Sequence, residues 1–201
     1  MNELRLFMVM LGCKPAGRHT EQHDIFFGIG KSLEALVPQM ISSWKEAEGN
    51  IHIDAWREVA QVDNYIITIN EKKSDETTAI KEKLFFINLG GYKQNDFEEY
   101  HYKVLTVAAD KGEAVRNSKQ TAFYKHCGFQ GAVSHVDDKY GIDVDDLYEI
   151  EDILPAGLKE KYCINLLAAK DNAADELHIG YIKIDKLISA NQAERKKVKT
   201  V

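Results

Sequence analysis

Residues Leu6–Gly12 read LFMVMLG, and residues Leu84–Gly90 read LFFINLG. Each run is followed, at the same distance, by a Glu-x-His triplet, Glu21–His23 after the first run and Glu99–His101 after the second. An apolar run that ends in Leu-Gly is typical of a buried strand. Because the two halves share this pattern without a gap, we interpret the chain as an internal duplication.

A second set of motifs extends the predicted repeat. A His-x-Asp motif and an Asp-x-Tyr motif follow in the first half, and both return in the second half at a slightly larger constant offset. The matched motifs are His52-x-Asp54 with His135-x-Asp137, and Asp63-x-Tyr65 with Asp146-x-Tyr148. The change of offset predicts extra residues around Phe129–Val133, in a surface connection where insertions are tolerated.

Composition and charge exclude several classes of partner. Of the 201 residues, 44% are hydrophobic and 29% are charged, which is typical of a globular protein. The formal net charge of -6 argues against nonspecific binding to nucleic acid or to anionic lipid. No run approaches the ~20 apolar residues of a membrane-spanning helix. We therefore expect neither a nucleic-acid partner nor a membrane partner.

The cysteines predict a reducing compartment. Cys13, Cys127 and Cys163 are odd in number, far apart and without C-x-x-C spacing. Reduced thiols are the simplest interpretation, and they predict a cytoplasmic protein.

Local patterns predict the same element order in each half: two strands, a helix and two strands. Apolar spacing predicts helices between Ser32 and Gly49 and from Asp110 to His126. The fold class is therefore expected to be α+β, with two tandem ββαββ repeats related by pseudo-two-fold symmetry and a C-terminal β-hairpin. Such a chain is either a monomer with internal pseudo-symmetry or a homodimer. The expected strands are 5–11, 23–29, 51–56, 65–69, 83–89, 101–108, 133–137, 147–150, 162–168 and 177–184.

Composition shifts mark the expected boundaries. The repeats cover 1–70 and 83–154, and they are joined by a charged linker at 71–82. The hairpin covers 155–188, where it could protect an exposed sheet edge. A basic tail at 189–201, which contains Arg195-Lys196-Lys197, is expected to be disordered.

The assembled unit resembles a bacterial family of proteins of unknown function, domain of unknown function 1543. The matching residues are Leu11-Gly12, Glu21-Gln22-His23-Asp24 and His52-Ile53-Asp54. The second copy departs from this signature because Tyr102 stands where the first copy has Asp24. The resemblance implies domain boundaries and two tandem copies, and it implies no activity.

The repeated polar residues form the candidate site. Because strand side chains alternate between faces, the members of each Glu-x-His or His-x-Asp triplet point to one side of the strand. Two imidazoles and two carboxylates per copy suit a divalent ion such as Zn²⁺, Mn²⁺ or Fe²⁺. Such an ion could bind once per repeat, or once where the repeats meet. The candidate ligands are Glu21, His23, His52, Asp54, Glu99, His101, His135 and Asp137.

Three functions remain open at this point. The same residues could form buried hydrogen-bonded pairs with a structural role only. They could line a polar site in a module that binds a small ligand or a protein and serves a regulatory role. They could also be the metal ligands of a hydrolase-like enzyme. Convergence of Glu21, His23, His52 and Asp54 within coordination distance around an open position would favour the metal-dependent enzyme over the binding module.

Overall fold

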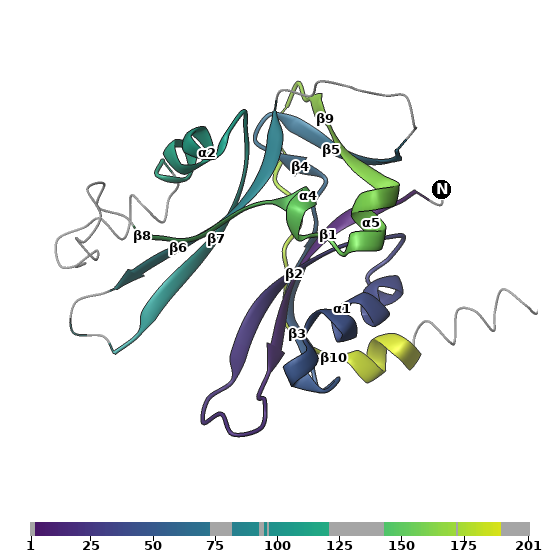
Figure 1. Cartoon of the computed structure of the whole chain (residues 1–201), viewed down its shortest axis with the longest axis vertical. Coiled ribbons are helices and arrows are strands. Elements are labelled where there is room, and N and C mark those ends of the chain that lie inside the picture. Colours follow the sequence, from purple (N-terminus) through teal and green to yellow (C-terminus); the bar gives the residue numbers. More distant parts are fainter. Residues whose placement is uncertain are drawn as a thin grey trace, which may run out of the picture. The chain divides into compact units, whose positions relative to one another are not determined.

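In the computed structural model the first apolar run forms β1 (Arg5–Cys13), a central strand of an antiparallel four-stranded sheet (Figure 1). Its neighbours are β2 (Gln22–Gly30) and β3 (His52–Glu58), and β10 (His178–Lys183) pairs with β3 at the edge. Nearly every residue of β1 is buried, which explains why the run is apolar at consecutive positions.

The structure describes residues 3–72, 82–92, 95, 97–120, 143–171 and 173–189. The chain divides into two units, and its class is α+β as predicted. Unit 1 comprises Met1–Lys72 and Leu154–Val201, and unit 2 comprises Lys73–Ile153. Within the described ranges no helix is long and apolar enough to cross a membrane.

Helices cover one face of the four-stranded sheet in unit 1. Alternate residues of β1, such as Val9 and Leu11, lie in a core with Leu36 and Met40. The helix predicted between Ser32 and Gly49 is broken into η1 (Glu34–Leu36), α1 (Val37–Ser43) and η2 (Lys45–Ala47). Pro at the start of α1 removes a backbone donor, and Trp44 leaves helical geometry at φ -120°. Helical residues 184–189 complete this layer.

The predicted C-terminal hairpin is wrong, because its two strands join different sheets. β9 (Tyr162–Ala168) follows α5 (Ala156–Lys161) and pairs with β5 (Tyr65–Glu71), whose other neighbour is β4 (Gln61–Val62). β10 pairs with β3 instead.

Asp175, between β9 and β10, anchors this arrangement. Its Oδ1 accepts hydrogen bonds from the backbone N–H groups of Ala60 and Gln61, at 3.1 and 3.0 Å. Its side chain is only 3% exposed, and its Oδ2 lies 3.8 Å from Arg57 Nη1. The connection is thereby held against the end of β3, so the chain cannot turn directly from β9 into β10.

Unit 2 contains a three-stranded antiparallel sheet in the order β7-β6-β8. The strands are β6 (Lys83–Tyr92), β7 (Glu99–Ala108) and β8 (Asp143–Glu149), and α4 (Ile150–Ile153) follows β8. α2 (Lys111–Ser118) begins with a capping box in which Asp110 accepts from the Glu113 N–H and Glu113 accepts from the Ala109 N–H, both at 2.8 Å. The end predicted for this helix and the predicted strand 133–137 lie outside the described residues.

The two sheets repeat the same strand register. Gly12 pairs with His23 and His52, and Gly90 pairs with His101 and Asp143. The first residue of the central strand makes an ion pair with the last residue of the third strand in each sheet. These pairs are Arg5–Glu58 at 2.8 Å and Lys83–Glu149 at 2.7 Å.

This register corrects the predicted matching of motifs in the second half. β8 pairs with β6 as β3 pairs with β1, so Asp146 and Tyr148 lie on the third strand. Asp63, with which Asp146 was matched, lies in the turn between β4 and β5 at φ 52°. The correspondence between Asp63-x-Tyr65 and Asp146-x-Tyr148 is therefore wrong.

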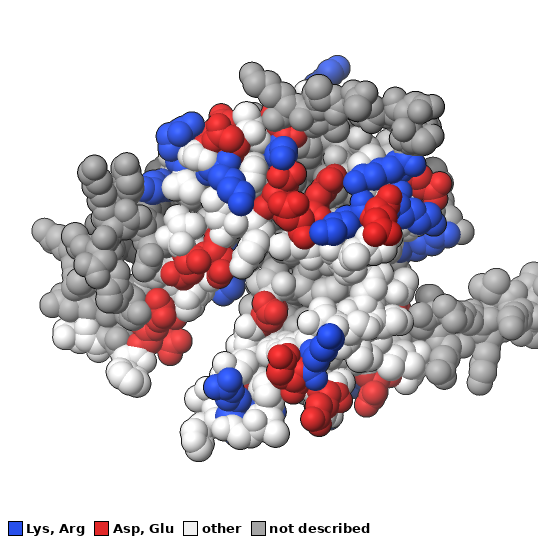
Figure 2. All heavy atoms as spheres, in the orientation of Figure 1, with Lys and Arg blue, Asp and Glu red and all other residues white. Residues whose placement is uncertain are grey.

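Charged side chains are mixed over the visible surface. On the face shown in Figure 2, acidic and basic side chains of the described residues are interspersed. Some form exposed pairs, such as Lys161 Nζ and Glu71 Oε1 at 3.6 Å. Exposed pairs of this kind contribute little to stability, at most about 1 kcal/mol each.

Candidate functional site

Gly12 forms the floor of the candidate site in unit 1. It lies on the sheet face opposite the helices, between His23 on β2 and His52 on β3, which are its two register partners. A Cβ atom at this position would collide with His52 Nε2 and would lie 2.5 Å from Asp54 Oδ2. The two side chains therefore fill the space that a larger residue would occupy, which explains the glycine in the Leu-Gly motif.

Asp54 lies on the same face as His52, at a β-bulge of β3. Met10 pairs with Ala55 and Leu11 pairs with Ile53, so Asp54 is an extra residue without a partner on β1. Ile53 points into the helix-side core, and His52 and Asp54 on either side of it point to the opposite face. Bulges of this kind often occur next to functional sites.

The four predicted residues of unit 1 converge. Asp54 Oδ2 lies 3.2 Å from His23 Nε2 and 3.3 Å from His52 Nε2. Glu21 Oε1 lies 3.1 Å from His52 Nε2, and Glu21 Oε2 lies 3.8 Å from His23 Nε2. Each of the two imidazole nitrogens thus lies within 4 Å of both carboxylates.

Exposure differs strongly among the four side chains. His52 is 11% exposed and Asp54 is 25% exposed, whereas His23 and Glu21 are close to half exposed. Asp54 Oδ2 is itself buried and accepts no hydrogen bond, although both imidazole nitrogens are near it. The two imidazole nitrogens are therefore close to Asp54 Oδ2 but are not aligned to donate hydrogen bonds to it.

Asp24, which belongs to the family signature, does not join this group. It pairs with Leu11, a residue of the helix-side core, so it lies on the other face of β2. Its Oδ1 accepts a hydrogen bond from the backbone N–H of Ile25 at 2.8 Å. Tyr102 pairs with Leu89 as Asp24 pairs with Leu11, so the difference between these two residues lies on the other face from the polar groups.

Tyr181 is a component of the site that sequence reasoning missed. Its ring lies against the His52 imidazole, with centroids 4.4 Å apart, and it comes from β10 at the sheet edge. On the same pair of strands, His178 stacks on Trp56 at 3.9 Å. No local signal identifies Tyr181, because it reaches His52 through strand pairing between distant parts of the chain.

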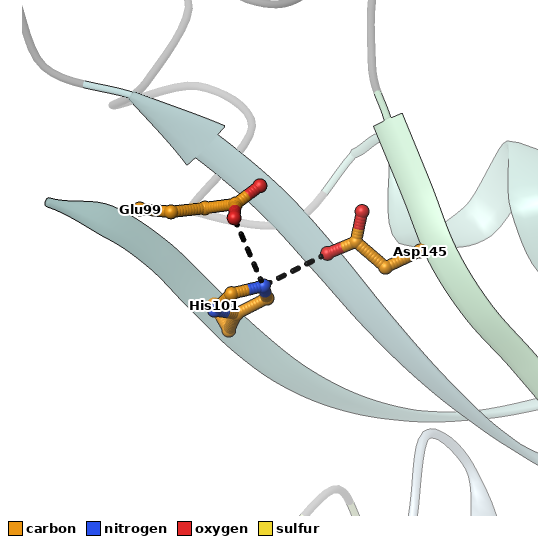
Figure 3. Close-up of side chains that lie close together, drawn as sticks. All are labelled: Glu99, His101 and Asp145. Atoms are coloured by element: carbon orange, nitrogen blue, oxygen red, sulfur yellow. Dashed lines mark ion pairs between the residues drawn. The ribbon is translucent and has the colours of Figure 1, made fainter. Parts of the chain in front are cut away.

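Unit 2 repeats part of the arrangement. Glu99 and His101 from β7 and Asp145 from β8 lie together, and both ion pairs end on His101 Nε2 (Figure 3). The distance from His101 Nε2 is 3.2 Å to Asp145 Oδ2 and 4.0 Å to Glu99 Oε2. A Cβ at Gly90 would lie 2.5 Å from Asp145 Oδ2, as expected for the counterpart of Gly12.

Asp145 takes the place that was predicted for Asp137. Asn88 pairs with Asp146 and Leu89 with Val144, which makes Asp145 the extra residue of a second bulge. The predicted ligands His135 and Asp137 lie outside the described residues. The sequence does contain a local signal for the two bulges. In both, an apolar residue is followed by Asp, one further residue and a second apolar residue: Ile53-Asp54-Ala55-Trp56 and Val144-Asp145-Asp146-Leu147.

Two further groups beside the sites have shifted pKa values. Burial, and secondarily the Glu21 carboxylate, raises the pKa of the Cys13 thiol. Burial lowers the pKa of Lys103, which lies two residues after His101 and donates from Nζ to the His101 carbonyl at 3.2 Å. Each shift favours the neutral form of its group.

A comparison with known protein families gives a match in the first half of the chain. Residues 18–69 match the family model described as Domain of Unknown Function (DUF1543), which confirms the predicted resemblance over this segment. The matched segment contains Glu21, His23, His52 and Asp54. No curated protein matches the chain.

One similar solved structure is that of protein Il1583 from Idiomarina loihiensis. It is 21% identical and superimposes with a TM-score of 0.61, covering 90% of this chain and 98% of that chain. At this identity the similarity concerns the fold alone.

Proposed function

We propose that this protein is a small-ligand-binding module whose ligand is a divalent transition-metal ion, held in unit 1 by Glu21, His23, His52 and Asp54. The observation that carries the proposal is the approach of two imidazole nitrogens, His23 Nε2 and His52 Nε2, to one buried carboxylate oxygen that accepts no hydrogen bond. A cation would satisfy this oxygen and both nitrogens together.

Three of the four contact distances agree with ligand atoms arranged around a shared cation. A tetrahedral zinc ion bound at about 2.0–2.1 Å holds its ligand atoms about 3.3 Å from one another. Three of the contacts in unit 1 measure 3.1, 3.2 and 3.3 Å. Ordinary N–H···O hydrogen bonds extend to about 3.2 Å, so the lack of any aligned hydrogen bond at Asp54 Oδ2, and not the distance, favours a cation.

The exposure of the side chains supports a ligand site over a purely structural pair. Structural polar pairs are buried and satisfied, whereas His23 and Glu21 are 45% and 46% exposed. His52 and Asp54 supply the sheltered half of the group, and the exposed half gives an ion access from solvent. Gly12 keeps the space beside them free of a side chain.

The donor set defines the class of ion. Two imidazoles with two carboxylates suit a borderline divalent ion such as Zn²⁺ or Fe²⁺, and they suit Ca²⁺ or Mg²⁺ poorly because those ions prefer oxygen ligands alone. Zn²⁺ is the appropriate first probe because it accepts this mixed set in tetrahedral geometry.

The decisive test is metal content and zinc affinity of the untagged full chain, compared with His23→Ala. His19→Ala is the matched control, since His19 is an exposed histidine in the same β1–β2 connection. We expect His23→Ala to lose one equivalent of tightly bound zinc per chain, measured by inductively coupled plasma mass spectrometry and chelator competition. His19→Ala should retain it. Equal zinc binding by wild type and His23→Ala, or no binding by either, would contradict the proposal.

We also propose that the two units derive from one repeat. The shared register, the two bulges, the two floor glycines and the pairs Arg5–Glu58 and Lys83–Glu149 support this interpretation. The relation by a two-fold axis stays a prediction. Cys13 and Cys163 are free thiols, which supports a role in a reducing cytoplasm.

A further inference from the structure

The polar group of unit 2 is built from two strands on either side of a glycine. Gly90 on β6 pairs with His101, which repeats the register of the floor glycine in unit 1. Glu99 lies two residues before His101 on β7, so alternation places both side chains on one face. Asp145 reaches the same face from β8, and its Oδ2 lies over Gly90. Three donor side chains therefore meet above the central strand (Figure 3).

The donor atoms have separations that one ion can span. One donor atom of each residue lies within 4.8 Å of the other two. His101 Nε2 is 3.2 Å from Asp145 Oδ2 and 4.0 Å from Glu99 Oε2. Bonds of about 2.0–2.2 Å to a zinc ion allow two ligand atoms to lie at most about 4.3 Å apart. A rotation of the exposed Glu99 side chain is sufficient to bring all three atoms within this limit.

The charges of the group favour a cation. Two carboxylates this close repel each other, and a single imidazolium neutralises only one of them. A divalent cation neutralises both and leaves the imidazole in its neutral, metal-binding form. Lys103 lies on the same face of β7, and its Nζ donates a hydrogen bond to the His101 carbonyl at 3.2 Å. This hydrogen bond is to the backbone and not to either carboxylate.

The exposure of the group argues against a purely structural role. Glu99 and His101 are 39% and 35% exposed, and exposed ion pairs contribute at most about 1 kcal/mol to stability. The next carboxylate of the bulge, that of Asp146, has a structural role instead. Its two oxygens accept hydrogen bonds from Asn88 Nδ2 and from the Tyr148 hydroxyl, both at 3.3 Å. The inserted aspartate before it is the carboxylate directed to the histidine.

We propose that Glu99, His101 and Asp145 form a second divalent-metal site, so that the chain binds one ion in each unit. One imidazole with two carboxylates suits Zn²⁺, Mn²⁺ or Fe²⁺. The exposed side chains give an ion access from solvent. The proposal goes beyond the function proposed for unit 1 and uses different ligands, so either site can fail without the other.

The test counts the zinc equivalents bound by the untagged full chain with one unit disabled at a time. Equilibrium dialysis against buffered zinc, followed by mass spectrometry, gives the count. We expect two equivalents in wild type, one in His101→Ala, one in His23→Ala and none in the double variant. Equal binding by wild type and His101→Ala would overturn the second site, and loss in His23→Ala would still support unit 1. Loss in His101→Ala alone would support the second site and refute the first.

Two pairs of nearly isosteric variants separate ligation from general negative charge. In the His23→Ala background, Asp145→Asn should weaken zinc binding at least about tenfold, since even changes around metal ligands alter affinity by about 10–100-fold. Asp146→Asn removes the same charge one residue later and should change the affinity little. Glu99→Gln and Glu98→Gln form the second pair, because Glu98 is an exposed carboxylate one residue earlier. Equal losses within each pair would show that zinc is attracted only by the acidic surface, and would overturn the site.

Discussion

Asp54 and Asp145 are the inserted residues of two β-bulges that interrupt their sheets at the same register. Each carboxylate lies beside a histidine of the strand on the other side of the central strand, with Oδ2 at 3.2 Å from His23 Nε2 in unit 1 and from His101 Nε2 in unit 2. In a regular strand, the residue after each aspartate would point to the face of the sheet opposite to the aspartate. Alternation along the strand places each aspartate on the face of the floor glycine, and the bulge leaves it without a partner on the central strand.

Replacing Asp54 by Asn should remove a ligand and keep the bulge. We expect the zinc affinity of unit 1 to fall at least about tenfold, because an anionic donor is lost. Asp24→Asn is the control, since Asp24 lies on the other face and contacts only its local backbone in the described hydrogen bonds. Chelator competition on both variants measures the difference, and a similar loss in Asp24→Asn would contradict the assignment.

Replacing Gly12 by Ala should push the His52 and Asp54 side chains out of their positions. The new Cβ would overlap His52 Nε2 and Asp54 Oδ2, so we expect loss of zinc binding and a decrease of about 1–3 kcal/mol in the free energy of unfolding. Gly157→Ala is the control, because a Cβ there meets nothing within 4 Å. This control should stabilise the protein by about 0.4–1 kcal/mol in urea unfolding. Normal zinc affinity in Gly12→Ala would refute the steric argument.

Tyr181 should act by positioning His52. We expect Tyr181→Ala to accelerate zinc dissociation from unit 1 severalfold and Tyr181→Phe to behave as wild type, because the ring and not the hydroxyl contacts the imidazole. Stopped-flow chelator exchange measures the rate. Ile179→Ala on the same strand is the control, since Ile179 is 82% exposed. An equal effect of both alanine variants would indicate a general weakening of β10.

Cys13 should react slowly with alkylating reagents. Its pKa is raised by burial and by Glu21, so its thiolate fraction at pH 8 is reduced. In a Cys127→Ser background we expect iodoacetamide to modify Cys13 at least about tenfold more slowly than Cys163, which is only partly buried. In metal-free protein, Glu21→Gln should move the pH midpoint of the Cys13 reaction downward. Equal rates at the two cysteines would contradict this prediction.

The ion pair of unit 2 should be sensitive to alkaline pH. Glu149 raises the pKa of Lys83, so the pair stabilises the folded state at neutral pH and loses its effect as the pH rises through the raised value. Because the Lys83 side chain is 47% exposed, the effect at pH 8 should be about 0.2–1 kcal/mol. Urea unfolding of Lys83→Met should show a penalty at pH 8 that diminishes as the pH rises through the raised pKa of Lys83.

The counterpart in unit 1 provides the control for that measurement. Arg5 pairs with Glu58 at 2.8 Å, and its guanidinium stays charged throughout the range. Arg5→Met should therefore keep its penalty at alkaline pH. A penalty that persists equally in Lys83→Met would show that the lysine acts through its alkyl chain.

Much of the fold was predictable because strand formation is a local property. The apolar runs that begin at Leu6 and Leu84 form β1 and β6, since consecutive buried positions require apolar side chains. The convergence of Glu21 with His23 was also predictable, because alternation places residues two apart on one face. The break in the helix before Gly49 was missed, although Pro38 at its start was a visible signal.

Sequence alone determined that the chain contains two similar sheets, each with a glycine beside a Glu-x-His strand. Tertiary structure decided which aspartate completes the second group, and it separated β9 from β10 into different sheets. The physical reason is that pairing between distant strands leaves little trace in local patterns. A bulge of one residue reverses the faces of the residues that follow it, and the pairing with the central strand shows that the bulges lie at Asp54 and Asp145.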